Sequence, residues 1–153
     1  MKRLALLAVA AVVLAGCGGS SRLSKPAYEQ KLQADGKSVQ RAVTALTKTS
    51  PGTLADLAKR VDAAEASVKQ AADDLDSVEP PADAVADNTA IVTALRTIQS
   101  GLERLKQAAA KGDAAAAQKI AAQLSSSPQL KAAEKAATDL KKKGYKVGPI
   151  GAP

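Results

Sequence analysis

Residues 54–78 read LADLAKRVDAAEASVKQAADDLDSV, and their apolar positions recur at alternating steps of three and four residues. Because an α-helix turns once every 3.6 residues, this spacing places all of them on one face of a helix. Thr53, just before this stretch, and Asp56 within it form a variant of the capping box that marks a helix start. The stretch therefore predicts a long amphipathic helix with the apolar positions Leu54, Leu57, Val61, Ala64, Val68, Ala71, Leu75 and Val78.

The preceding segment predicts a helix over residues 26–48, with Pro26 in its first turn and a break at residues 49–52. Pro80 and Pro81 end the 54–78 helix and lead into a third one, which stops at Gly112. The apolar face of the first helix comprises Leu32, Gly36, Val39, Val43 and Leu46, and that of the third comprises Ala84, Asn88, Ile91, Leu95, Ile98, Leu102, Leu105 and Ala109.

A fourth helix begins after Asp113, which can cap it, and ends at Gly144. Its apolar positions slip by one residue between Leu124 and Leu130, where residues 125–128 read SSSP. We therefore expect a kink or a short break there, with Ser127 capping the second piece.

Four amphipathic helices joined by short turns predict an all-α fold, an up-down-up-down four-helix bundle over residues 26–144, followed by an irregular tail over residues 145–153. In this order the turn between the second and third helices lies at the same end as the start of the first helix and the C-terminal tail. Tyr28 and Tyr145 are expected to pack at that end. The faces are rich in Ala, so we expect a slim bundle with little internal volume.

The N-terminus has the parts of an export signal. Lys2 and Arg3 precede an apolar stretch over residues 4–14. Eleven residues span only about 17 Å as a helix, against about 30 Å of hydrocarbon in a bilayer. This length favours a removed leader over a permanent membrane helix.

The run Leu14-Ala15-Gly16-Cys17 resembles the bacterial lipobox, a Leu and two small residues before a Cys. The resemblance implies that residues 1–16 are a lipoprotein signal peptide, that the chain is cleaved before Cys17, and that Cys17 carries a diacylglycerol and the new amino terminus a further acyl chain such as palmitate. Residues 17–25 would then be the lipidated cysteine and a short flexible tether. The expected location is the extracytoplasmic face of the cell membrane, or the outer membrane in a cell with two membranes.

The rest of the chain resembles the small alanine-rich helical lipoproteins of unknown function from high-GC Gram-positive bacteria. The features that carry this resemblance are the turns at Pro80-Pro81 and Lys111-Gly112-Asp113 and the terminal stretch from Lys143 to Gly148. The resemblance implies no activity.

Charge and composition limit the classes of molecule that this chain is expected to bind. Without Lys2 and Arg3 the chain keeps 20 basic against 15 acidic residues, a net charge of +5, which favours anionic lipid head groups or anionic wall polymers. Nucleic acid is not an expected partner, because two tyrosines and no Phe or Trp offer little for base stacking. The chain has no His and only one Cys, so we expect no enzyme, no cofactor and no metal site.

The end of the bundle near the tether carries opposite charges. Six acidic residues lie between positions 73 and 87 without a basic one, whereas lysines crowd the end of the fourth helix. They can screen one another, or the lysines can form a basic patch that faces anionic lipid. A calcium site on the acidic turn is a third alternative, although the spacing matches no EF-hand loop. The patch would comprise Lys141, Lys142, Lys143 and Lys146.

Asn88 and Gly36 interrupt the apolar faces at similar heights, roughly 10 to 15 Å from the tether end, so we expect them to face one another. Asn88 then either fixes the register of the helices or forms a small polar binding niche with Gly36. Under the register hypothesis, Asn88→Leu should raise thermal stability.

These features together predict a membrane-anchored, non-catalytic lipoprotein that acts as a binding or structural component of the cell envelope, through contacts with an envelope protein or an anionic wall polymer. The alternative is a carrier or sensor that holds a small hydrophobic ligand between its helices.

Overall fold

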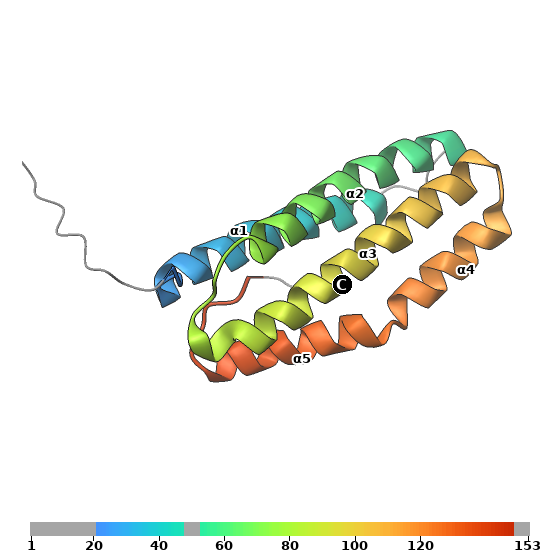
Figure 1. Cartoon of the computed structure of the whole chain (residues 1–153). Coiled ribbons are helices and arrows are strands. Elements are labelled where there is room, and N and C mark those ends of the chain that lie inside the picture. Colours follow the sequence, from blue (N-terminus) through green and yellow to red (C-terminus); the bar gives the residue numbers. More distant parts are fainter. Residues whose placement is uncertain (1–20, 48–52, 149–153) are drawn as a thin grey trace, which may run out of the picture.

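The computed structural model describes residues 21–47 and 53–148, and regular structure in these ranges is entirely helical (Figure 1). The helices are α1 (Lys25–Thr47), α2 (Leu54–Asp76), α3 (Val85–Ala110), α4 (Ala114–Ser125) and α5 (Pro128–Lys142), with a 3-10 turn η1 (Ala82–Ala84) before α3. The predicted helices are confirmed to within a few residues at each end.

The helix ends form where the sequence indicated. The side chains of Thr53, Asp113 and Ser127 accept hydrogen bonds from backbone N–H groups three residues later, and so cap α2, α4 and α5. Gly112 and Gly144 adopt left-handed conformations with φ of +73° and +76°, which stop α3 and α5. The predicted break in the fourth helix is confirmed between α4 and α5.

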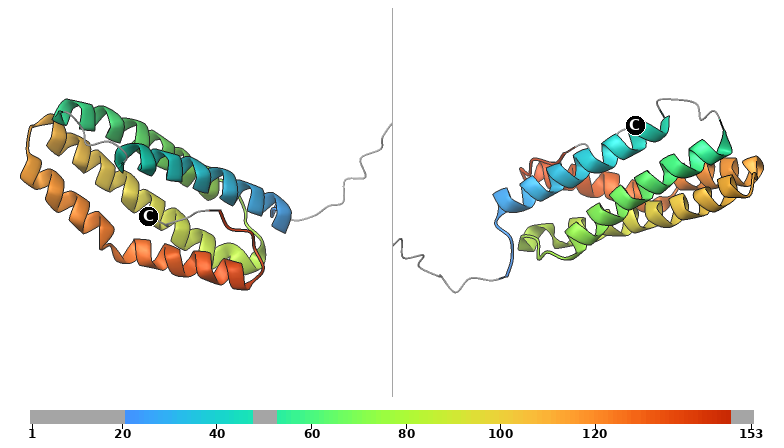
Figure 2. Two further views of the ribbon diagram at one scale, coloured as in Figure 1. Left: turned by 180° about the vertical axis from the view of Figure 1, so that it is seen from behind. Right: turned by 90° about the horizontal axis from the view of Figure 1, so that it is seen from above.

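The helices run up and down in an antiparallel four-helix bundle, in which α4 and α5 together take the place of the fourth helix (Figures 1 and 2). The third helix, α3, is central, because it packs against α2, α4 and α5, whereas α1 packs mainly on α2. The all-α bundle is thus confirmed. Val43 departs from the prediction and is 41% exposed, since α1 lacks an extensive contact with α4 at that end of the bundle.

Two separate apolar clusters hold the bundle together. The main cluster is built from α1, α2, α3 and α5, and its fully buried members include Leu32, Val68, Leu75, Ile91 and Leu140. A small second cluster fastens α4 to α3 through Ala108, Ala117 and Ile120, with Leu105 and Ala116 beside them. No buried residue of α4 belongs to the main cluster, so α4 is held by a smaller apolar cluster than the other helices.

Residues 21–24, the described part of the predicted tether before α1, contact the bundle. The Leu23 N–H donates to the Glu79 carbonyl at 2.8 Å, and the Arg22 guanidinium donates to the Pro80 carbonyl at 3.1 Å. Leu23 also packs against the main cluster. The predicted signal peptide (residues 1–16), Cys17 and residues 18–20 lie outside the described residues, as does the end of the tail over residues 149–153.

The described part of the tail, residues 145–148, follows α1. Tyr145 is 4% exposed, and the Gln33 side-chain amide donates to the Lys146 carbonyl at 3.1 Å. A Cβ on Gly148 would lie 2.9 Å from the Gln33 Cα, so the two backbones touch. The tail thus links α1 to the end of α5, two helices that have little direct contact.

Asp35 is an electrostatic weak point in the contact between α1 and α2. Its Oδ2 atom is buried and has no hydrogen-bond partner among the described residues. One turn earlier on α1, Lys31 pairs with Asp74 of α2 at 3.7 Å. Burial raises the pKa of Asp35 from 3.8 to about 6; the Lys31 charge opposes this rise and the Asp74 charge adds to it.

Asp35 should make the bundle less stable at neutral pH than at mildly acidic pH. Its folded-state pKa is raised, so the folded protein holds the proton of Asp35 more tightly than the unfolded chain does. The resulting stabilisation is fully present below pH 3.8 and is lost as the pH rises through about 6. Asp35→Asn should therefore raise the free energy of unfolding at neutral pH by about 1 kcal/mol, with allowance for solvent screening, and leave it unchanged near pH 4. Urea unfolding across this pH range measures the effect.

Glu134→Gln is the matched control, since it removes a carboxylate from the exposed side of α5. If Asp35→Asn and Glu134→Gln show the same pH dependence of stability as the wild type, the buried carboxylate of Asp35 is not the cause.

Candidate functional site

Polar side chains gather at two places in the bundle. The first is the tether end, where the start of α1, the turn between α2 and α3, and the tail meet. The second is a groove between α3 and α4, farther from the tether. Each corresponds to a different kind of site.

At the tether end, Asn88 joins three helices by two buried hydrogen bonds. Its Oδ1 accepts from the Tyr28 hydroxyl of α1 at 2.9 Å, and its Nδ2 donates to the Leu75 carbonyl of α2 at 3.1 Å. Leu75 lies in the last turn of α2, where carbonyls lack partners within the helix. Asn88 on α3 thus satisfies one of these carbonyls and positions Tyr28.

The expected pairing of Asn88 with Gly36 is wrong. Asn88 pairs with Tyr28, and Gly36, although buried, lies eight residues further along α1, about 12 Å up the axis. The expected pairing rested on similar heights of Asn88 and Gly36 along the bundle. In the structure the long side chain of Tyr28 extends to the Asn88 amide and bonds it. Because both ends of the Asn88 amide are already bonded within the fold, this position is a structural connection and leaves no free niche for a ligand.

The tail closes over this connection through Tyr145. The rings of Tyr28 and Tyr145 meet edge to face, with centroids 6.0 Å apart, and the Lys25 ammonium lies 4.4 Å from the Tyr145 ring centre. The Tyr145 hydroxyl donates to Asp83 Oδ1 at 2.6 Å. Burial and this hydrogen bond raise the pKa of Tyr145 to about 12, and burial together with the Asp87 charge raises the pKa of Tyr28. Both rings are therefore neutral donors at physiological pH, and their packing at this end is confirmed.

The structure divides the expected basic patch into two parts. The Lys143 ammonium donates to the Asp83 carbonyl and to Asp87 Oδ2, each at 2.6 Å, and so serves the fold. Lys142 shares Asp139 with Lys135. Among the described residues, the side chains of Lys141 and Lys146 have no acidic partner, and both residues are exposed.

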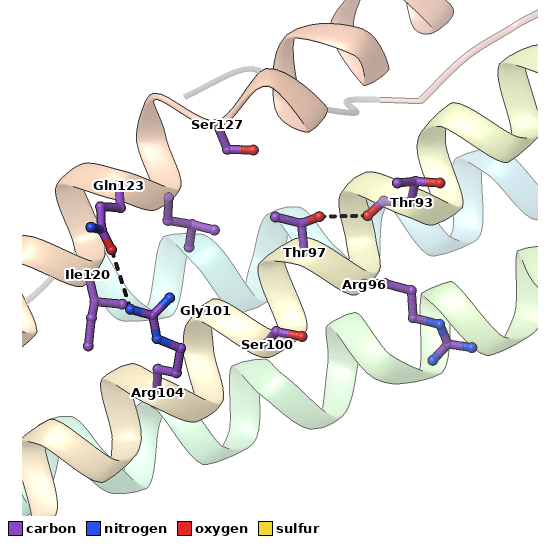
Figure 3. Close-up of a pocket in the computed structure, with 10 residues that line it drawn as sticks. Thr93, Arg96, Thr97, Ser100, Gly101, Arg104, Ile120, Gln123 and Ser127 are labelled. Atoms are coloured by element: carbon purple, nitrogen blue, oxygen red, sulfur yellow. Dashed lines mark hydrogen bonds between the residues drawn. The ribbon is translucent and has the colours of Figure 1, made fainter.

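The groove between α3 and α4 has a volume of about 400 Å³ and opens beside the break between α4 and α5 (Figure 3). Gly101 of α3 faces Leu124 of α4 so closely that a Cβ on Gly101 would lie 2.9 Å from Leu124 Cδ1. These two residues and Ile120 supply the apolar part of the groove. The remaining lining is polar or basic and comprises Thr93, Arg96, Thr97, Ser100, Arg104, Gln123 and Ser127.

The two arginines of the groove differ in their surroundings. Arg96 turns toward α2, where it pairs with Asp73 at 2.6 Å and with Asp76 at 3.6 Å (Figure 3). Arg104 reaches across toward α4 and donates to Gln123 Oε1 at 3.4 Å, its one hydrogen bond with described residues. No carboxylate lines the groove. Among the described residues, the positive charge of Arg104 therefore has no acidic partner, and its hydrogen bond to Gln123 is long and weak.

This groove was not predicted from the sequence. The break at residues 125–128 was predicted, but the pairing of Gly101 with Leu124 depends on how α4 is rotated against α3. A glycine inside a predicted helix, opposite a predicted break, is the signal that could have indicated a close approach of two helices.

The described residues offer neither a metal cluster nor a membrane-spanning helix. In residues 21–47 and 53–148, no three His, Cys, Asp or Glu side chains lie together in a way that could hold a metal ion. None of the described helices is both long enough and apolar enough to cross a bilayer.

Comparison with known proteins gives no relative. No family model matches the chain, and no curated protein or solved structure is significantly similar to it. Inferences about function therefore depend on the sequence and the geometry described above.

Asn88→Leu should destabilise the bundle, contrary to the expectation from the register hypothesis. The leucine would leave the Tyr28 hydroxyl and the Leu75 carbonyl buried without partners, at about 1 to 3 kcal/mol per group. Thermal and urea unfolding measure the loss.

The double variant Tyr28→Phe with Asn88→Leu tests the cause, since it also removes the stranded hydroxyl. It should recover part of the stability lost in Asn88→Leu. A single variant as stable as the wild type would show that these hydrogen bonds contribute little.

Proposed function

We propose that this chain is a lipid-anchored, non-catalytic binding or structural component of the bacterial cell envelope. Cys17 would carry the lipid, and the bundle would face outward from the membrane. Support comes from the resemblance of residues 14–17 to the lipobox and from the basic, apolar segment that precedes them. Two or three acyl chains give stable attachment, where one would be marginal.

The observation that carries this proposal is the run Leu14-Ala15-Gly16-Cys17. The attachment of Arg22 and Leu23 to the turn between α2 and α3 bears on how the bundle would be placed at the membrane. Four residues lie between Cys17 and Arg22, and the five residue-to-residue steps of an extended chain span at most about 18 Å. The bundle would therefore stand close to the membrane, with the α2–α3 turn and the tail nearest to it.

Charge at the tether end supports a modest electrostatic contribution to membrane contact. Lys141 and Lys146 are exposed and have no acidic partner among the described residues, so they are suited to anionic head groups. Lys143 is bonded to Asp87, and Lys142 shares Asp139. The lipid would supply most of the attachment energy, and the lysines would bias the orientation of the bundle.

The outward-facing parts of the bundle would bind an envelope protein or an anionic wall polymer. The net charge of +5 after removal of the leader and the groove without carboxylates both favour an anionic partner. A second candidate is a carrier of a small hydrophobic ligand. It is favoured by the small size of the apolar cluster that holds α4 on α3, because a movement of α4 away from α3 would open the apolar part of the groove.

Cys17→Ala tests the anchor. Wild-type protein extracted from the membrane of its source cell should have the mass of the chain from Cys17 onward plus the diacylglycerol and acyl groups. The variant should retain the leader and lack these groups. Ser21→Ala is the matched control and should be lipidated like the wild type. Intact-protein mass spectrometry measures all three, and a wild-type chain without acyl groups would refute the proposal.

Affinity purification of the lipidated protein distinguishes the two candidate functions. A binding or structural component should retain an envelope protein or a wall polymer, identified by mass spectrometry. A discrete small lipid that remains bound between the helices would favour the carrier instead.

A further inference from the structure

We infer that the groove between α3 and α4 binds a phosphate group of a polyol phosphate polymer of the cell wall. This inference names the partner class for the proposed envelope function and rests on that function for the orientation of the bundle. The volume of about 400 Å³ lies in the range of small-ligand sites and suits one phosphate with its adjoining polyol units.

Arg104 and Gln123 are the groups that would hold the phosphate. The Arg104 guanidinium presents paired N–H donors that match phosphate oxygens, and the Gln123 amide adds another donor from the opposite helix (Figure 3). Their mutual hydrogen bond is long, at 3.4 Å, so a charged acceptor placed between them would form stronger bonds than the one it displaces.

Hydroxyl groups lie beside this pair on the same face of α3. Thr97 donates to the Thr93 carbonyl at 2.9 Å, which leaves its oxygen free to accept from a ligand hydroxyl. Ser100 is exposed, and its hydroxyl makes no hydrogen bond with described residues. Thr97 and Ser100 would therefore bind the hydroxyls of a polyol, and the Ser100 hydroxyl can also donate to a phosphate oxygen.

The apolar base of the groove accommodates the carbon backbone of such a ligand. Leu124 and Ile120 line it from α4, and the missing side chain of Gly101 lets Leu124 approach α3. Donors at one end, hydroxyls along one wall and an apolar base fit an ester of phosphate and a polyol better than a purely hydrophobic ligand.

Position decides between a wall polymer and a membrane phospholipid as the source of the phosphate. Gly101 lies sixteen residues beyond the start of α3, about 24 Å from the tether end of the bundle. With that end toward the membrane, lipid head groups would lie beyond the reach of Arg104, whereas a polymer in the surrounding wall would not.

Isothermal titration calorimetry of the full chain in a non-ionic detergent, with a short glycerol phosphate oligomer as the probe, tests the inference. Arg104→Gln should weaken binding about tenfold or more, because it removes the charge but keeps hydrogen-bonding capacity. Lys119→Gln changes the net charge equally on the exposed side of α4 and should have little effect. Thr97→Val should weaken binding of the oligomer but not of inorganic phosphate. Circular dichroism confirms that each variant is folded.

Three outcomes would overturn the inference. They are no binding of the oligomer at millimolar concentration, an equal loss in Arg104→Gln and Lys119→Gln, and Arg104-dependent binding to phosphatidylglycerol vesicles that exceeds binding to the oligomer. The last would assign the groove to lipid. The oligomer measurements do not require the lipid on Cys17, so a failure of the anchor proposal would leave Arg104-dependent binding intact and would remove only the argument about orientation.

Discussion

The rest of the bundle depends on the two hydrogen bonds of the Asn88 side chain. They connect the first turn of α1 to the last turn of α2 through α3, and both bonds are buried. Apolar packing along the helices leaves sliding and rotation only loosely defined, because Ala-rich faces are smooth. A buried amide that needs two partners opposes both sliding and rotation of the helices. Either motion would leave a buried polar group without a hydrogen bond, at a cost of about 1 to 3 kcal/mol.

Charges around this connection are largely used within the fold. Lys143 reaches Asp83 and Asp87, Lys25 covers Tyr145, and Tyr145 bonds Asp83. The lysine-rich end of α5, which the sequence suggests as a membrane-facing patch, thus partly serves to hold α5 against η1 and the start of α3. Lys141, Lys146 and Arg104 are among the basic residues that have no acidic partner among the described residues.

Helix positions could be predicted from the sequence because apolar periodicity, caps and turn residues act over a few residues. Thr53, Asp113 and Ser127 cap helices wherever the neighbouring chain is placed, so their roles are readable locally. The partner of Asn88 could not be predicted in this way, since it depends on the relative rotation of α1 and α3. The exposure of Val43 and the contact of Gly101 with Leu124 likewise depend on which helices become neighbours, and periodicity within one helix carries no such information.

The attachment of Arg22 and Leu23 has a mechanical consequence. A force applied at Cys17 would not first peel α1 from its N-terminus, because it meets the Leu23 hydrogen bond to Glu79 and the Arg22 hydrogen bond to Pro80 before it reaches Lys25. The load passes instead into the α2–α3 turn, next to the most extensive helix contact in the bundle. If Cys17 is the point of attachment, tension would thus be borne by the middle of the chain, while α4, at the far end and outside the main cluster, would carry no load.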